Sequence, residues 1–320
     1  MNNIRVVRVA RSVHRKHAFE SRRWYAKTKF PPVVTPMLPP GTFENKVAFI
    51  TGGGTGIGRG MAKMLARLGA NVAIVSRKQD VLDATAQELS AKTRMKILPV
   101  AADVRDPAAI AAAVDKCEQE LGLPNIVINN AAGNFISPTE KLSPNAWKTV
   151  VDIVLNGTAF VTLEIGKRLI KAEQGANFLA ISATYTNLGS GFVVPSCAAK
   201  SGVEALTKSL AAEWGRYGMR FNCISPGAVF TKGAFSRLDP EGQFTKTGIE
   251  GPIERVGEIA EVANLAAYLV SDYSNWLTGE VIRMDGGHLN HIAGDFNKLV
   301  DLDEAKWKML EAAIRNTSGS

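Results

Sequence analysis

The glycine-rich stretch TGGGTGIG at 51–58 has residue types and a spacing that could do chemistry. It follows an apolar, strand-like run and precedes a helical pattern, which is where a phosphate-binding loop lies. Glycine lets the backbone turn tightly and approach a pyrophosphate, whose charge then meets the N–H groups at the helix start. We therefore expect the phosphates of a dinucleotide to bind at Gly52, Gly53, Gly54, Thr55, Gly56 and Ile57.

The residues after the second apolar run indicate which dinucleotide binds. This run ends at Ser76, and Arg77 and Lys78 follow. A site for NAD usually has Asp or Glu here, whereas Arg77 could bind a ribose 2′-phosphate through two parallel hydrogen bonds. A basic pair at a helix start can also be simply solvated. We expect NADPH as the cofactor, with Asp103 near its adenine, although an aspartate at a strand end can equally be a turn former.

Short apolar runs alternate with helical patterns along the body of the chain. The runs are rich in Val and Ile and mostly lack polar alternation, as strands covered on both faces should. They span 47–51, 71–76, 96–102, 125–129, 177–182, 220–225 and 281–284. Helical patterns such as 107–121 and 196–216 lie between them, which predicts right-handed crossovers. The sequence predicts an α/β fold: a doubly wound, Rossmann-type parallel sheet in a single domain, with its core over about 45–293.

Two segments are expected to differ from this core. The proline-rich composition before residue 45 predicts an extended arm over 26–44. Residues 230–250 combine glycine with mixed charge, which favours a flexible substrate lid. We assign 45–320 to the cofactor-binding domain, including this lid.

The net charge of +8 is concentrated at the N-terminus. Nine Lys and Arg residues but one acidic residue lie within 1–30, so the rest of the chain is formally neutral. A neutral body has little attraction for phosphate backbones, which argues against nucleic acid as a partner. An Arg-rich, acid-poor segment with an apolar face is typical of a mitochondrial transit peptide, here over 1–25, although a disordered basic tail is the alternative.

Cysteine, histidine and apolar content argue against metal and membrane sites. Cys117, Cys197 and Cys223 show no paired or metal-ligand spacing and fit a reducing compartment. Two of the four histidines lie in the N-terminal segment, so we expect no metal site. No apolar run reaches the ~18 residues that a membrane span needs, so we expect no membrane span.

Three further motifs follow the glycine loop in order: NNAAG at 129–133, Pro226-Gly227 after the sixth run and DGG at 285–287. Over about 45–290 the chain therefore resembles the short-chain dehydrogenase/reductase family. The resemblance implies that Lys200 holds the nicotinamide ribose, and that members form tetramers, so a homotetramer is expected. It also implies a loop over the nicotinamide carboxamide, made of Pro226, Gly227, Ala228 and Val229.

The usual pattern of this family has a catalytic tyrosine four residues before the lysine, but here Ser196 takes that position. Three explanations are open: the chain is not catalytic, Ser196 takes the role of the tyrosine, or the catalytic tyrosine lies elsewhere in the chain. Tyr185 lies just past the carboxyl end of a predicted strand, where open α/β sheets place their sites. Ser182 lies close to the point at which the usual pattern has its catalytic serine. A tyrosine merely packed in a loop is the alternative for Tyr185.

The runs NFISPTE at 134–140, LSPNAWK at 142–148 and GAFSRL at 233–238 narrow the resemblance to mitochondrial 2,4-dienoyl-CoA reductases. This implies that Tyr185 is the active-site tyrosine and that Asn134 lies opposite it, both donating hydrogen bonds to a developing enolate. Asn156 matches the helix asparagine that supports a proton relay in the family. Contacts with the acyl-CoA are implied for Arg105, Phe135, Ser143 and Arg237.

The chemistry of a conjugated thioester explains a relocated tyrosine. A carbonyl reductase protonates the oxygen next to the carbon that takes the hydride. In a 2,4-dienoyl thioester, the hydride goes to the δ carbon and the charge reaches an oxygen several bonds away. The donor must then lie further from the nicotinamide.

The resemblance implies NADPH-dependent reduction of 2,4-dienoyl-CoA thioesters to 3-enoyl-CoA, an auxiliary step in the β-oxidation of unsaturated fatty acids in the mitochondrial matrix. Two alternatives stay open. One is another acyl-CoA or 3-ketoacyl reductase of the family. The other is a non-catalytic NADP-binding subunit, since a fold alone does not prove activity.

Overall fold

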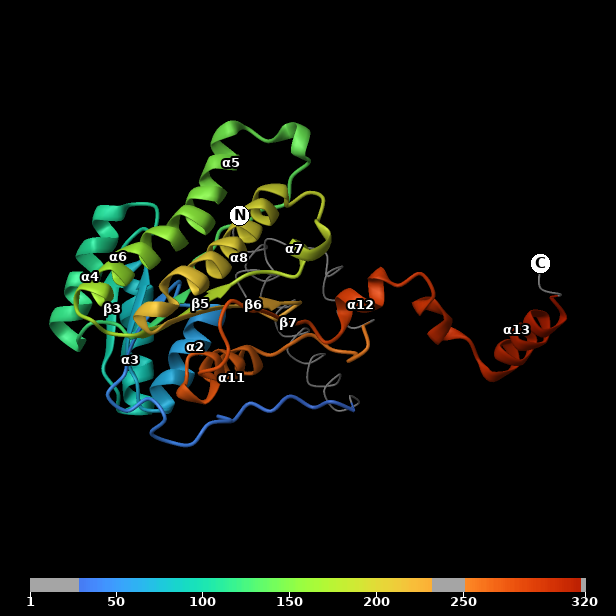
Figure 1. The fold of residues 1–320 in the computed structure, drawn as a ribbon, viewed down its shortest axis with the longest axis horizontal. Coiled ribbons are helices and arrows are strands. Elements are labelled where there is room, and N and C mark those ends of the chain that lie inside the picture. Colours follow the sequence, from blue (N-terminus) through green and yellow to red (C-terminus); the bar gives the residue numbers. More distant parts are fainter. Residues whose placement is uncertain (1–28, 232–250, 318–320) are drawn as a thin grey trace, which may run out of the picture.

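The computed structural model describes residues 29–231 and 251–317, and Figure 1 shows how their helices and strands are arranged. The expected transit peptide at 1–25 lies outside these residues. The expected lid also lies outside them apart from its first two residues, and so does Arg237.

Seven parallel strands form one sheet within the described residues. They are β1 (Val47–Thr51), β2 (Asn71–Ser76), β3 (Ile97–Ala101), β4 (Ile126–Asn129), β5 (Ala176–Ile181), β6 (Met219–Pro226) and β7 (Val281–Met284). Each bound lies within one residue of the run predicted from sequence. The predicted doubly wound α/β fold is confirmed.

Helices cover both faces of the sheet because its strands carry apolar side chains on both sides. In β1, Ala48 and Ile50 point to one face and Val47 and Phe49 to the other, and all four are buried. The first face packs against α2 (Gly56–Arg67), α3 (Gln79–Thr93) and α11 (Ile259–Leu269). The second face packs against α4 (Pro107–Leu121), α6 (Gly157–Lys171) and α8 (Val194–Trp214).

The strand order β3-β2-β1-β4-β5-β6-β7 reverses direction between β1 and β4. From β1 the chain builds the sheet in one direction, adding β2 and then β3. From β4 it builds the sheet in the opposite direction, adding β5, β6 and β7. The loops at the carboxyl ends of β1 and β4 therefore separate and leave a crevice, which is the usual binding position in such sheets.

A long helix crosses the second face. It consists of α5 (Pro144–Val151), a π-helical turn (Asp152–Asn156) and α6, which run on without a break. It is the one helix of the described residues that is long and apolar enough to cross a membrane. Its most apolar 18-residue stretch has a mean hydropathy of 1.4, and 44% of that stretch is buried. Core helices of globular proteins can be equally long and apolar. Its fully buried Val154, Val161 and Ile165 are typical of a core helix.

The described part of the N-terminal arm lies along the body beside α11 (Figure 1). Asn264 of α11 holds it, because its Oδ1 accepts the N–H of Met37 at 3.0 Å and its Nδ2 donates to the carbonyl of Thr35 at 2.8 Å. Leu38 and Phe43 are buried, so the end of the arm is part of the core.

The C-terminal part of the chain leads away from the sheet (Figure 1). It contains α12 (His288–Ala293), a 3-10 turn (Asn297–Asp301) and α13 (Glu304–Asn316). No residue of α13 is buried. The domain range of 45–320 therefore includes an extension that takes no part in the core, as the narrower core range of 45–293 implies.

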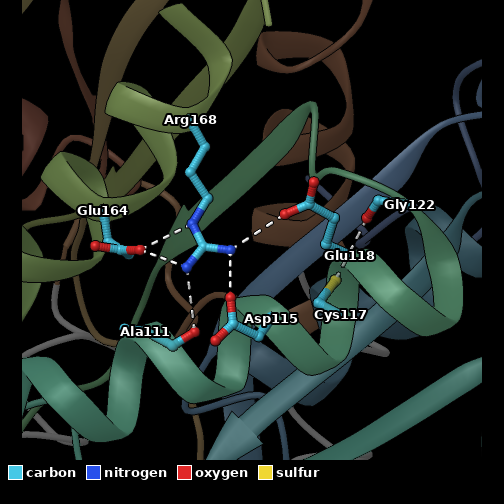
Figure 2. Close-up of polar contacts among 7 residues, drawn as sticks. All are labelled: Ala111, Asp115, Cys117, Glu118, Gly122, Glu164 and Arg168. Atoms are coloured by element: carbon cyan, nitrogen blue, oxygen red, sulfur yellow. Dashed lines mark hydrogen bonds and ion pairs between the residues drawn. The ribbon is translucent and has the colours of Figure 1, made fainter. Parts of the chain in front are cut away.

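Arg168 joins α6 to α4 (Figure 2). Its guanidinium donates to Glu164 on its own helix, through Nε at 2.8 Å and Nη2 at 2.6 Å. On the neighbouring helix α4, Asp115 accepts a hydrogen bond from Nη1 at 2.6 Å and Glu118 accepts one at 3.1 Å. The Arg168 side chain is 24% exposed, so water screens these contacts only in part.

We predict that Arg168→Met lowers the free energy of unfolding by about 1–2 kcal/mol, because charge-assisted hydrogen bonds between two helices are lost. Denaturant titration at low and at high salt measures the change, which should shrink at high salt. Lys167→Met on the same helix is the control, since Lys167 is exposed. Equal stability of the two variants would contradict the prediction.

Candidate active site

The loop between β1 and α2 leaves no room for side chains at two glycines. Gly52 has a φ of +65°, and a Cβ there would lie 2.7 Å from Asn130 Nδ2. At Gly58, a Cβ would lie 2.3 Å from the carbonyl oxygen of Gly52. The side chain of Thr55, which precedes α2, makes no capping hydrogen bond. The first N–H groups of α2 thus remain available to an anion, and the loop fits the pyrophosphate of a dinucleotide.

Thr51 and Asn130 join the carboxyl ends of β1 and β4. The Oγ1 of Thr51 accepts the N–H groups of Asn130 and Ala131, both at 3.0 Å. In return, Asn130 Nδ2 donates to the carbonyls of Thr51 at 3.0 Å and Gly52 at 3.3 Å. These bonds set the distance between the two loops that border the crevice.

The segment expected to cover the nicotinamide follows β6. Its first glycine, Gly227, packs so closely that a Cβ would lie 2.8 Å from the Cα of Asp285. Val229 is buried and pairs with Gly257 in an isolated bridge. Further on, Thr231 lies near the glycine loop, 3.6 Å from where a Cβ of Gly56 would be. The run Pro226 to Val229 therefore leads from the sheet to the phosphate loop.

Arg77 and Lys78 are exposed at the end of β2. Among the residues that the structure describes, neither side chain makes a hydrogen bond or an ion pair. The charge of Arg77 nevertheless acts on Asp103 at the end of β3. The two basic groups thus lie at the edge of the crevice and are free to bind an anion such as a ribose phosphate.

Asp103 and Arg105, which were expected to contact adenine and acyl-CoA respectively, are paired with each other. Arg105 Nη2 donates to Asp103 Oδ2 at 2.6 Å, and Nε donates to Oδ1 at 3.0 Å. These hydrogen bonds hold the pKa of Asp103 below its usual value, and the charge of Arg77 adds to the effect. Arg105 must therefore share its guanidinium with Asp103 if it also binds substrate.

Tyr185 opens the short helix α7 (Tyr185–Leu188), directly after the loop that follows β5. Its Oη lies 2.7 Å from the Oγ of Ser196, at the start of α8. The serine at the position of the usual tyrosine is thus a hydrogen-bond partner of Tyr185. Burial raises the pKa of Tyr185 and outweighs the opposite effect of the Ser196 bond. The phenol stays protonated near neutral pH and is therefore a donor rather than a base.

Lys200 is buried on α8, one turn after Ser196. Its Nζ donates a hydrogen bond to the carbonyl of Ile181, the last residue of β5. Burial lowers the pKa of Lys200 to about 8, although nearby Cys223 and Glu204 oppose this shift. The amino group therefore lies at the carboxyl end of β5, where the loop that leads to Tyr185 begins.

Glu204 was not predicted as a site residue. Its Oε1 accepts hydrogen bonds from the hydroxyls of Ser182 and Thr186, on either side of Tyr185. The signal in the sequence is spacing, since Ser196, Lys200 and Glu204 recur every four residues and share one helix face.

Asn134 and its neighbours lie in the segment after β4. The Oδ1 of Asn134 accepts the N–H of Phe135 at 2.9 Å, while its Nδ2 has no partner among the described residues. Ser137 N donates to the carbonyl of Phe192 at 2.9 Å, which joins this segment to the one before α8. The segments of Asn134 and Tyr185 are thereby linked.

Ser143 and Asn156 have local structural roles. Ser143 caps α5, with its Oγ accepting the N–H of Ala146 at 3.1 Å. Asn156 Nδ2 donates to Asp152 Oδ1 at 2.7 Å within the π-helical turn. The acyl-CoA contact expected for Ser143 and the relay expected for Asn156 stay predictions.

The chain belongs to the short-chain dehydrogenase/reductase family. The family model described as enoyl-(acyl carrier protein) reductase matches residues 52–288. The solved structure of a short-chain dehydrogenase from Bacillus anthracis is 40% identical, with a TM-score of 0.70, and covers 77% of this chain and 97% of its own. The fold and family inferred from the motifs are confirmed, and with them a nicotinamide cofactor.

Two curated relatives narrow the comparison. A Caenorhabditis elegans protein named probable 2,4-dienoyl-CoA reductase 3 is 44% identical over 304 residues, which is 92% of this chain and 97% of the relative. The peroxisomal 2,4-dienoyl-CoA reductase of Rattus norvegicus is 37% identical over 271 residues, 84% of this chain and 92% of the relative. The resemblance to 2,4-dienoyl-CoA reductases is confirmed over most of the chain.

We predict that Gly58→Ala raises the Kd for the nicotinamide cofactor by at least about tenfold, because the new methyl group would push Gly52 out of place. Fluorescence titration with NADPH and NADH measures this change. Gly215→Ala is the control, since a Cβ there meets nothing within 4 Å. Unchanged cofactor affinity in Gly58→Ala would contradict the assigned phosphate loop.

Proposed function

We propose that this chain is a 2,4-dienoyl-CoA reductase, which uses NADPH to reduce 2,4-dienoyl-CoA thioesters to 3-enoyl-CoA. The observation that carries the proposal is the 2.7 Å contact between Tyr185 and Ser196. This contact holds a protonated phenol on the segment after β5. In the usual family pattern, the phenol is carried by the helix that corresponds to α8. The names of the two relatives support the same reaction.

When bound, NADPH would supply the hydride that reduces the δ carbon of the dienoyl group, and a proton from solvent would add at the α carbon to give 3-enoyl-CoA. The residues of this chain act on the negative charge that develops at the thioester oxygen. Tyr185 donates its phenolic proton in a hydrogen bond to that oxygen, and Ser196 can donate to Tyr185 at the same time. Asn134 donates through its unpartnered Nδ2. Neither group has to act as a base, and the raised pKa of Tyr185 fits this role.

Lys200 contributes a buried positive charge and holds the nicotinamide ribose. Its pKa of about 8 leaves the ammonium form predominant near neutral pH. Because buried charge is poorly screened, the ammonium stabilises a developing enolate over a longer distance than an exposed lysine would.

The cofactor preference for NADPH rests on the free cations at the end of β2. Arg77 can bind a 2′-phosphate through two hydrogen bonds, and Lys78 adds charge beside it. An NAD-type ribose would meet no carboxylate at this position.

A mitochondrial matrix location is part of the proposal, and its support is the basic, acid-poor composition of residues 1–25. There the enzyme would assist the β-oxidation of unsaturated fatty acids. We also propose a homotetramer, because members of the family usually assemble in this way.

The deciding experiment follows NADPH oxidation by the purified enzyme with a 2,4-dienoyl-CoA, with acetoacetyl-CoA and without an acceptor. Turnover of the dienoyl-CoA supports the proposal. Turnover of the ketone alone would identify a carbonyl reductase, and no turnover with either substrate would favour a non-catalytic subunit.

Replacing the tyrosine tests its role. We predict that Tyr185→Phe lowers kcat by about 10²–10³, because one donor to the enolate is lost, while the Kd for NADPH stays unchanged. Ser196→Ala should be milder, since the phenol keeps its proton. Tyr273→Phe is the control, because Tyr273 is 63% exposed. A larger loss in Ser196→Ala than in Tyr185→Phe would refute the relocated tyrosine.

Replacing Arg77 tests the cofactor preference. We predict that Arg77→Gln weakens NADPH binding by roughly 10- to 100-fold, the value of one charge-assisted contact, and leaves NADH binding unchanged. Kd values for both cofactors measure the difference. Lys116→Gln, which removes an exposed charge on α4, is the control. Equal losses for NADPH and NADH would rule out contact with a 2′-phosphate.

A further inference from the structure

A row of side chains on one face of α8 holds the segment that carries Tyr185. Ser196 lies 2.7 Å from Tyr185 at Oη, and Lys200 donates to the carbonyl of Ile181. Glu204 is the third member of the row, one turn further along. The helix therefore contacts the segment before, at and beyond its tyrosine.

Glu204 contacts this segment on both sides of Tyr185. A single carboxylate oxygen, Oε1, accepts from the hydroxyl of Ser182 and from that of Thr186 at 2.8 Å. Ser182 precedes the tyrosine by three residues, and Thr186 follows it directly. Because both hydroxyls can donate to an ionised carboxylate, the charged form of Glu204 suits this arrangement best.

The charge of Glu204 also reaches Lys200. Burial is the main influence on this lysine and lowers its pKa to about 8, while Cys223 on β6 and Glu204 on α8 act in the opposite direction. Burial raises the pKa of Cys223 itself to about 11, so that its thiol is neutral near pH 8. Of these two groups, Glu204 is the one that also contacts the segment of Tyr185.

We propose that Glu204 is a positioning residue of this active site, whose carboxylate fixes the turn on both sides of Tyr185 and lies one helical turn from Lys200 on the same face of α8. This rests on the proposed function, in which Tyr185 and Lys200 act on the dienoyl-CoA. Glu204 acts through Ser182, Thr186 and Lys200. The effect therefore has a geometric and an electrostatic part, which different substitutions separate.

The first experiment measures steady-state kinetics of the full-length enzyme with NADPH and a 2,4-dienoyl-CoA from about pH 6 to about pH 10, a range that brackets the titration of Lys200. Glu204→Ala should lower kcat by about 10- to 100-fold with little change in the KM for NADPH, because the phenol is no longer held in place. Glu213→Ala, an exposed position on α8, should match the wild type.

Glu204→Gln separates charge from geometry. The amide oxygen can still accept both hydroxyls, so kcat at low pH should stay within a few-fold of the wild type. Without the negative charge, the pKa of Lys200 should fall. Since the lysine is charged below its pKa, the alkaline limb of kcat/KM should move to lower pH. A limb that stays in place would overturn the electrostatic part of the proposal.

A second experiment needs no substrate. Hydrogen exchange over 182–188 should be faster in Glu204→Ala than in the wild type, with Glu204→Gln close to the wild type. If Glu204→Ala does not fold, Thr186→Val removes one of the two contacts, and a faster exchange and a few-fold lower kcat are then expected.

The outcomes distinguish this inference from the proposed function. A wild type without dienoyl-CoA turnover would refute the function, and exchange would still test the contacts of Glu204. A wild type that turns over, together with unchanged kcat and exchange in Glu204→Ala or Thr186→Val, would refute the positioning role.

Discussion

The hydrogen bonds between Thr51 and Asn130 form the constraint on which the rest of the site depends. They join β1 and β4, the two strands between which the sheet order reverses. The glycine loop leaves the sheet after Thr51, and the segment of Asn134 leaves it after Asn129, directly before Asn130. A methyl group at Gly52 would meet Asn130, so the same contact explains why the loop needs glycine. Cofactor loop and substrate segment thus share one anchor.

Helix α8 anchors the segment that carries Tyr185, as Thr51 and Asn130 anchor the loops after β1 and β4. In the usual family pattern, the helix itself carries the tyrosine. Here it carries a serine, and the tyrosine comes from the segment after β5. The contacts of Ser196, Lys200 and Glu204 tie the segment from the end of β5 to α7 to this helix. In the proposed function, these contacts hold Tyr185 as a donor to an oxygen that lies several bonds from the hydride acceptor.

Strand and helix positions could be predicted closely because apolar runs and helical periodicity are local signals. The predicted strand at 71–76 and the predicted helix at 107–121 agree with the structure in every residue. Pairings of polar side chains could not be predicted in this way. Asp103 and Arg105 are only two residues apart, yet their ion pair depends on how the chain turns after β3. Ser143 likewise has a capping role that competes with its expected contact to substrate.

The sequence by itself determined the α/β class, the phosphate loop, the family and the absence of a tyrosine four residues before Lys200. Each of these depends on residue types that lie close together in the sequence, so it can be inferred without knowledge of the fold. The resemblance named Tyr185 as its replacement, and only the tertiary structure decided which side chains hold Tyr185. The bond between Tyr185 and Ser196 spans eleven residues and requires the end of β5 to lie against the first turn of α8. The contacts of Glu204 with Ser182 and Thr186 have the same origin, because they exist only once the sheet has brought α8 and the segment after β5 together.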